Sequence, residues 1–185
     1  MARPREFDIS RALIGAMEIF WRQGFKATNL PDLLKAMGLT RGSFYKAFDD
    51  KENVYLDALD QYDTTVVTKT LSILENCDAP LASDCLLMMF EPSSEPKRGC
   101  FICNAMVELA PDNPQVAAKT NAMAERLKHG IISVLEKRNI GQSADHRLEL
   151  GDVLLHLYFG HQAMGKSCVE ETNWHKRLKS VLGEE

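Results

Sequence analysis

The sequence predicts an all-α protein of about nine helices, in which three short N-terminal helices form a helix-turn-helix head on a larger helical body. Two observations predict this class. Apolar residues recur at intervals of three and four along almost all of the 185 residues, and clusters of glycine, proline and asparagine interrupt that pattern. No segment of the sequence alternates apolar and polar residues as a half-buried strand would.

The first two helices have clear start and stop signals. Asp8 is placed to cap the first helix, and Gly24 ends it. Thr28 or Asn29 can cap a short second helix, which stops at Gly38. The apolar stripe of the first helix consists of Ile9, Ala12, Leu13, Ala16, Met17 and Phe20.

A third short helix follows at once. Thr40 is placed to cap it, and Phe44 and Phe48 lie four residues apart on a face that should point inward. Three helices separated by Gly24 and Gly38 therefore occupy the first 48 residues. This arrangement is typical of a helix-turn-helix with a supporting first helix.

The remaining chain is expected to form a helical body. A D-x-x-E capping box at residues 49–52 predicts a fourth, longer helix from Asp50 to about Glu75. Polar and proline-rich interruptions divide the rest into five helices, at roughly 80–90, 99–109, 114–138, 144–167 and 170–182. We therefore expect two domains, 1–49 and 50–185, with the polar loop from Pro92 to Arg98 as the most flexible point.

The composition is ordinary for a globular protein, with 45% hydrophobic and 26% charged residues. No apolar run approaches the roughly 20 residues that span a bilayer, and the first residues lack the apolar stretch of a secretory signal. We therefore expect a cytoplasmic protein with no membrane partner. The five cysteines are odd in number without an export signal, so most are expected to be thiols rather than disulfides.

The net charge of −4 conceals an uneven distribution. Residues 1–48 carry eight basic and four acidic side chains, a balance of +4, whereas the remaining 14 basic and 22 acidic side chains give −8. A basic head on an acidic body indicates an anion-binding module, although a short segment can also be basic by chance.

The third helix has an outer face of donors and small residues. In a helix-turn-helix the second helix of the motif lies in the major groove, where its N-terminal residues reach base edges. Arg41 offers a fork suited to guanine, Ser43 can donate or accept at base edges, and Gly42 lets the backbone approach. Tyr45 and Lys46 suit phosphate oxygens, unless Tyr45 packs on the scaffold and the basic residues form a solvated face.

Residues outside this helix complete the predicted DNA interface. Thr28 at the second helix and Lys51 after the third are expected to contact phosphates. Arg3 and Arg5 lie on an N-terminal arm that could reach the backbone or a minor groove. The predicted DNA contacts are Thr28, Thr40, Arg41, Gly42, Ser43, Tyr45, Lys46 and Lys51.

Residues 7–60 resemble the N-terminal domain of TetR-family transcriptional regulators. The family pattern, G-F-x-x-T followed by G-[LV]-[ST]-x-G-x-[FL]-Y-x-x-F-x-x-K-E, is matched by Gly24, Phe25, Thr28, Gly38, Thr40, Gly42, Tyr45, Phe48, Lys51 and Glu52. Pro31 and Leu33-Leu34 are mild departures. The resemblance implies an all-α homodimer whose C-terminal domain binds a ligand, and repression that a small molecule relieves. Residues 98–117 are similar to a subgroup in which Gly-Cys opens the sixth helix and an acidic residue follows eight positions later.

Cys100 and Cys103 form a single C-x-x-C motif. Zinc normally needs four ligands, and no second closely spaced Cys/His pair exists, so neither a metal nor a cofactor is expected. The two cysteines could simply pack in the core, or act as a sensor. In a sensor, the helix N-terminus together with Lys97 and Arg98 would lower the pKa of Cys100 and raise its reactivity toward oxidants and electrophiles.

The spacing of Cys100, Asn104 and Glu108 places these three side chains along one helix face, where they could line an effector pocket. The candidate ligand or sensor residues are Met89, Cys100, Phe101, Cys103, Asn104, Glu108, Met123, Tyr158 and His161, each of which could instead be a simple core residue. The broad apolar stripes of helices 144–167 and 170–182 predict an isologous dimer through a four-helix arrangement.

The sequence therefore predicts a DNA-binding transcriptional regulator without catalytic residues. Its expected partners are a palindromic double-stranded operator, a second copy of the chain, and a small-molecule or electrophile effector. Two other classes stay open, a small thiol-disulfide oxidoreductase that uses Cys100 and Cys103, and a protein-interaction bundle.

Overall fold

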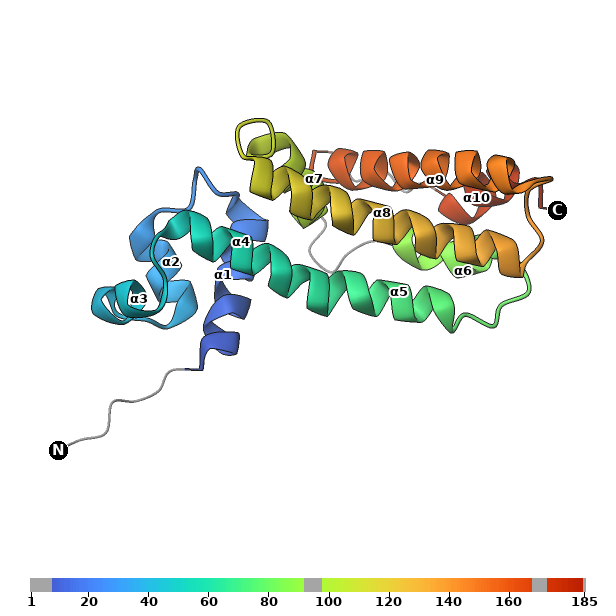
Figure 1. Ribbon diagram of the computed structural model, residues 1–185. Helices are drawn as coiled ribbons and strands as arrows, with labels where there is room; N and C mark the ends of the chain where they lie inside the picture. Colours follow the sequence, from blue (N-terminus) through green and yellow to red (C-terminus); the bar gives the residue numbers. More distant parts are fainter. Residues whose placement is uncertain (1–7, 92–97, 168–172, 185) are drawn as a thin grey trace.

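The computed structural model describes residues 8–91, 98–167 and 173–184, and all its regular elements are helices (Figure 1). The described residues contain no strand, which confirms the all-α class. Ten α-helices and one π-helical turn are present, but α4, the π-turn and α5 are continuous and form one long helix. The described helices thus number nine. None of them is long and apolar enough to cross a membrane.

The head consists of α1 (Ile9–Gln23), α2 (Leu30–Met37) and α3 (Arg41–Ala47). Each is capped by the predicted side chain: the oxygens of Asp8, Asn29 and Thr40 accept the N–H groups of Arg11, Asp32 and Ser43. The head core comprises Ala12, Ala16, Met17, Phe20, Leu33, Met37, Phe44 and Phe48, all at least nine-tenths buried. Arg3 and Arg5 lie outside the described residues.

A long helix connects the head to the body. It comprises α4 (Lys51–Tyr62), the π-helical turn η1 (Asp63–Val67) and α5 (Thr68–Glu75), and it runs from among the head helices along the body (Figure 1). Its cap is Asp50, whose carboxylate accepts the N–H of Asn53, rather than the predicted Asp49. The π-turn was not predicted.

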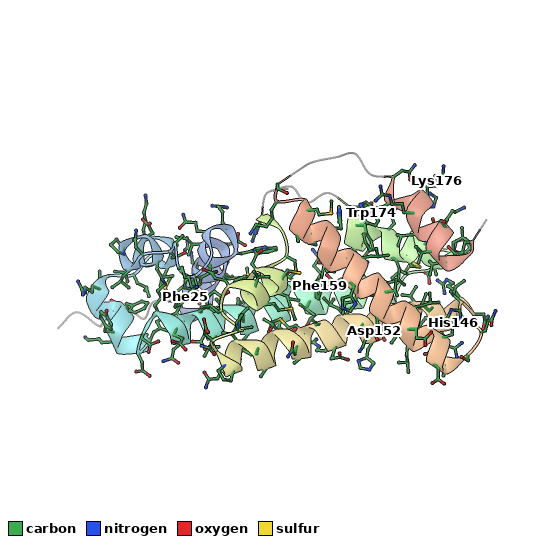
Figure 2. The ribbon with its side chains drawn as sticks, turned by 90° about the horizontal axis from the view of Figure 1, so that it is seen from above. Phe25, His146, Asp152, Phe159, Trp174 and Lys176 are labelled. Atoms are coloured by element: carbon green, nitrogen blue, oxygen red, sulfur yellow. A yellow bond between two sulfur atoms is a disulfide. The ribbon has the colours of Figure 1, made fainter. Side chains whose placement is uncertain are left out.

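The body is completed by α6 (Ala82–Phe90), α7 (Phe101–Glu108), α8 (Pro114–Lys137), α9 (Ala144–Met164) and α10 (Trp174–Leu182). These match the predicted ranges to within a few residues at each end. Helix α8 lies between α5 and α9, and α10 packs against α6 at the end of the molecule opposite the head (Figure 1). Figure 2 shows the same separation, with Phe25 in the head and Trp174 at the start of α10.

Two cysteines in the body differ from the prediction. Cys77 and Cys85 form a disulfide across the loop between α5 and α6, so the expectation of a thiol was wrong for this pair. Their Cα atoms lie 5.7 Å apart, within the range that a disulfide requires, because the loop turns the chain back on itself. Cys100 and Cys103 are free thiols. Cys168 lies outside the described residues.

Candidate nucleic-acid interface and thiol site

Helix α3 turns one face into the head and the other toward solvent. Phe44 is fully buried, whereas Arg41, Gly42 and Lys46 are exposed. Tyr45 is 52% exposed, and its ring rests edge-on against Phe44 with centroids 5.3 Å apart. Tyr45 is therefore braced by the scaffold at one side and open at the other. This outer face has the residues and the exposure that DNA contacts need.

The start of α3 is held in a defined shape. The Thr40 hydroxyl accepts the N–H of Ser43 at 3.2 Å and lies 3.0 Å from the Ser43 hydroxyl, with which it shares a hydrogen bond. Thr40 is exposed and Ser43 partly exposed. At Gly42, a methyl group built on Cα would meet no atom of the protein within 4 Å. The backbone of α3 is thus open to an external surface at this residue.

Two predicted phosphate contacts make hydrogen bonds inside the protein. Thr28 is fully buried, and its hydroxyl donates to the carbonyl of Gly24 at 2.6 Å. Lys51 donates from Nζ to the carbonyl of Phe25 at 2.6 Å, and the ammonium lies 4.1 Å from the centre of the Phe25 ring. Both side chains therefore fasten the turn between α1 and α2. The buried Thr28 hydroxyl cannot reach a phosphate, whereas a phosphate contact by Lys51 stays a prediction.

Cys100 is the N-cap residue of α7 and is only 2% exposed. A hydrogen bond from Cys103 lowers the pKa of the Cys100 thiol to about 7, against the opposing effect of burial. The N–H groups of Cys103 and Ile102 add to this effect, as expected at a helix N-terminus. The pKa of Cys103 is raised, first because Cys103 donates to Cys100. The pair therefore combines a Cys100 thiol whose pKa is lowered with a Cys103 thiol whose pKa is raised.

Among the described residues, the main causes of the lowered Cys100 pKa do not include the predicted charge of Arg98. The guanidinium of Arg98 lies 3.3 Å from the centre of the Trp21 ring and pairs with Glu18 at 2.7 Å, so its charge serves the contact with α1. Lys97 lies outside the described residues. Two tyrosines, Tyr62 and Tyr158, adjoin the thiol, and the Tyr62 hydroxyl lies 3.9 Å from the Cys100 sulfur.

Ring contacts connect several of the other predicted sensor residues to the thiol, since Tyr158 adjoins both Cys100 and Phe90, and Phe90 contacts His161. Phe101 is buried against Trp21, Tyr55 and Tyr62. His161 lies beside Phe90 and Trp174, with centroid distances of 5.8 and 4.7 Å. Met89 and Met123 are buried, with exposures of 5% and 2%.

The polar residues of α7 face the head rather than a pocket. The Asn104 amide donates to the carbonyls of Arg98 at 3.2 Å and Trp21 at 3.4 Å, and its oxygen accepts from Lys166 at 3.0 Å. Glu108 accepts hydrogen bonds from the head turn, which corrects its predicted place in a pocket. The i, i+4, i+8 spacing identified a common face but not the element that covers it. No group of three or more His, Cys, Asp or Glu suited to a metal occurs within the described residues.

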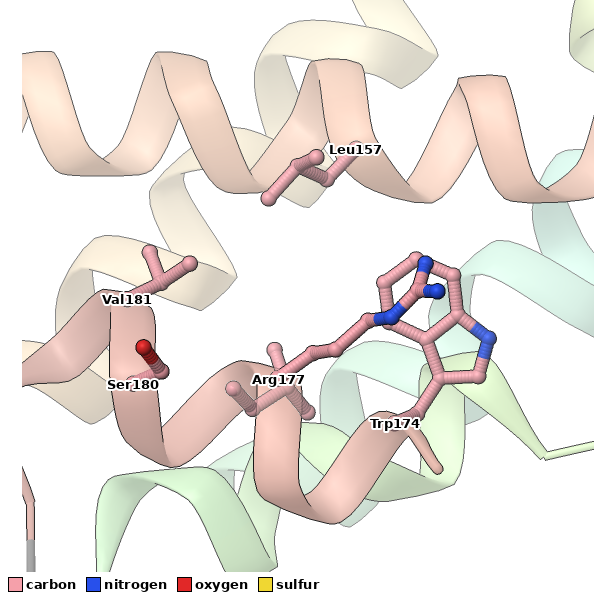
Figure 3. A pocket seen from close by; sticks show the side chains of 6 residues that line it. Leu157, Trp174, Arg177, Ser180 and Val181 are labelled. Atoms are coloured by element: carbon pink, nitrogen blue, oxygen red, sulfur yellow. The ribbon is translucent and has the colours of Figure 1, made fainter. Parts of the chain in front are cut away.

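The described residues do form an apolar groove of about 240 Å³, but it is not the predicted pocket. It lies between α9 and α10, where Leu157 faces Trp174, Arg177, Leu178, Ser180 and Val181 (Figure 3). These residues belong to the two helices expected to form a dimer.

Comparison with known sequences agrees with the geometry of the head. Residues 12–58 match the sequence profile of a family described as bacterial regulatory proteins, tetR family. The chain is 28% identical over 173 residues to the HTH-type transcriptional repressor ComR of Escherichia coli strain K12, covering 90% of this chain and 78% of ComR. It is 27% identical over 157 residues to the HTH-type transcriptional regulator YezE of Bacillus subtilis strain 168, covering 78% and 79% of the two chains.

Solved structures share the fold over nearly the whole chain. A cysteine mutant of the TetR family transcriptional regulator CifR, in complex with 26-bp double-strand operator DNA, superimposes with a TM-score of 0.80 at 23% identity, covering 98% of each chain. The reduced form of Escherichia coli NemR superimposes with a TM-score of 0.79 at 18% identity, covering 96% of this chain and 97% of NemR. The body as well as the head therefore has the fold of these proteins.

Proposed function

We infer that the chain is a DNA-binding transcriptional regulator of the TetR family, which the match over residues 12–58 and the similarity to ComR support. We propose that it acts as a homodimeric repressor which binds a palindromic operator and is released by thiol modification or by a small ligand. Family membership also sets aside the alternative of a thiol-disulfide oxidoreductase, since the family consists of regulators and not enzymes. We place the protein in the bacterial cytoplasm, where its DNA partner is found.

The observation that carries the DNA-binding proposal is the exposed face of α3. A buried Phe44 fixes this short helix, while Arg41, Tyr45 and Lys46 remain exposed, and none of them is paired with a carboxylate of the described residues. Arg41 suits the edge of a guanine, and Tyr45 and Lys46 suit phosphates on either side. Binding should weaken steeply with salt, because each phosphate that is neutralised releases counterions.

The exposed apolar side chains of α9 and α10 support the homodimer. Val153 and Met164 on α9 are 48% and 68% exposed, and Val181 on α10 is 38% exposed beside the apolar groove. Two copies related by a two-fold axis would bury these faces against each other in a four-helix arrangement. The two α3 helices would then read half-sites about one helical turn apart, or modestly more.

The thiol pair supports an oxidant or an electrophile as the effector. A two-electron oxidant such as diamide would react first with the Cys100 thiolate, which adds to the N=N bond while the other nitrogen takes a proton. The Cys103 sulfur would then attack the Cys100 sulfur, forming a disulfide and expelling the hydrazine with the Cys103 proton. The two thiols lose two electrons and two protons, and diamide gains both.

A mobility-shift titration tests the proposal. The purified protein is mixed with DNA that flanks its own gene, before and after treatment with diamide or a reactive aldehyde, alongside Cys100→Ser. Specific binding that is lost on treatment of the natural sequence and retained in Cys100→Ser supports a thiol-switched repressor. Specific binding that treatment leaves unchanged in both proteins contradicts the thiol switch and leaves a non-covalent ligand.

A further inference from the structure

The turn between α1 and α2 is fastened to the body by a single carboxylate. Glu108 is the last residue of α7, and its Oε2 accepts the N–H of Phe25 at 2.8 Å while Oε1 accepts the N–H of Lys26 at 2.7 Å. Both oxygens are used, across more than 80 residues of sequence. Hydrogen bonds from N–H groups to a carboxylate are stronger than those to a neutral acceptor.

The turn is shaped around this carboxylate. Gly24 has a φ of 83°, and a methyl group built on its Cα would lie 2.8 Å from Glu108 Oε2. From the opposite side, Lys51 donates to the carbonyl of Phe25. Burial lowers the pKa of Lys51, and the negative charge of Glu108 opposes this shift. The turn thus lies between an anion from the body and a cation at the start of α4.

This turn sets the position of the DNA-binding helices. It leads directly into α2, whose cap is Asn29, and α2 is followed by α3 after only three residues. A displacement of the turn therefore moves α2, and α3 with it. Glu108 does not lie on the DNA-facing side of α3, so its effect on DNA binding is indirect.

The other end of α7 holds the thiol pair. Helix α7 has eight residues and is about 12 Å long, with Cys100 as its N-cap and Glu108 at its C-terminal end. Aromatic rings pack continuously along it: the Phe25 ring contacts Tyr55, Tyr55 contacts Phe101, and Phe101 contacts Tyr62, with centroids 5.3 to 5.5 Å apart. Tyr62 in turn adjoins Cys100. A short rigid helix thus joins the thiols to the head turn.

We propose that Glu108 is a positioning residue for DNA binding, and that α7 transmits a chemical change at Cys100 to the head by moving the Glu108 carboxylate away from the amides of Phe25 and Lys26. This inference rests on the proposed function for the thiol pair and for the operator. Formation of a Cys100–Cys103 disulfide would change the N-cap and first turn of α7, and in this proposal the short helix carries that change to Glu108 at its C-terminal end. The head turn then loses its anchor.

Amide hydrogen exchange of the free protein tests the coupling without DNA. In the reduced natural protein the amides of Phe25 and Lys26 should be protected, and Glu108→Gln should speed their exchange by about tenfold or more, because the amide side chain keeps only one acceptor oxygen. Diamide should speed the exchange of the same two amides in the natural protein. It should not change their exchange in Cys100→Ser, and it should not speed it further in Glu108→Gln. Glu75→Gln, an exposed carboxylate on α5 changed in the same way, is the matched control and should leave them protected.

Operator affinity supplies the second readout. Glu108→Gln should weaken binding in the reduced state and bring the ratio of oxidised to reduced Kd close to one, whereas Glu108→Asp should retain part of that ratio. If Glu108 had a purely structural role, Glu108→Gln would weaken operator binding by the same factor in the reduced and the oxidised protein. The ratio of the two Kd values would then be unchanged, which would overturn the proposal. The proposal is also overturned if diamide does not change the exchange rates of the Phe25 and Lys26 amides in the natural protein. Failure of the proposed function would appear differently, as absent operator binding with the exchange response intact.

Discussion

Replacing Gly42 by alanine should separate the stability of the head from its affinity for DNA. Gly42 is an exposed residue in the first turn of α3, and an added methyl group would meet no protein atom within 4 Å. Alanine is favoured over glycine in a helix by up to about 1 kcal/mol. We therefore expect Gly42→Ala to stabilise the protein by about 0.5 to 1 kcal/mol, which for a chain of this size raises Tm by roughly 1 to 4 °C.

The same methyl group should interfere with the operator. If the backbone of α3 approaches the DNA at Gly42, a methyl group there forces the helix away from the bases and weakens the contacts of its neighbours. A loss of about 1.4 kcal/mol is a tenfold loss in affinity, and we expect at least that.

Thermal unfolding and a mobility-shift titration on the same preparations measure the two effects. A rise in Tm together with a tenfold loss of operator affinity supports the close approach of α3. A variant that is more stable and binds the operator within twofold of the natural protein would refute it, since the backbone at Gly42 would then be remote from DNA. A fall in Tm would refute the free space deduced at this residue.

Three further outcomes are expected. Gly15→Ala places a methyl group against a backbone carbonyl of α2, so it should destabilise the head by about 1 to 3 kcal/mol in denaturant titration, and an unchanged midpoint would contradict the close crossing of α1 and α2. The rate of Cys100 alkylation by iodoacetamide should rise with pH through about 7, and Cys103→Ala should move that midpoint upward, because alanine has no donor to replace the hydrogen bond that is the main cause of the lowered pKa; an unmoved midpoint would contradict the pairing. Cys77→Ser should lower the free energy of unfolding by about 2 to 3 kcal/mol under oxidising conditions, because the disulfide to Cys85 closes a loop over a separation of 8 residues. Added dithiothreitol should lower the Tm of the natural protein to that of the variant and leave the Tm of the variant unchanged.

The parts of the fold that follow from local chemistry could be predicted from the sequence. Asp8, Asn29 and Thr40 cap their helices as expected, because a cap depends on a side chain and an N–H only two or three residues away. The inward direction of Phe44 follows equally from helical spacing. The bounds of all the body helices were close for the same reason.

The parts that depend on distant segments could not be predicted in this way. Helical spacing placed Cys100, Asn104 and Glu108 on one face, but only the folded chain shows that the head, and not a ligand cavity, covers Asn104 and Glu108. The hydrogen bond from the Lys51 ammonium to the carbonyl of Phe25, which is 26 residues earlier, likewise has no local signal in the sequence. The π-turn η1 left no signal in the apolar pattern.

Selection of operators from a library of random duplexes is the most direct measurement of DNA recognition by this chain. The natural protein and Tyr45→Ala are each used to enrich bound DNA over several rounds. We expect the natural protein to enrich one palindromic motif with two half-sites about a helical turn apart, and Tyr45→Ala to enrich it far less. Recovery of duplexes with no common motif, at the same yield for both proteins, would contradict sequence-specific binding through the exposed face of α3.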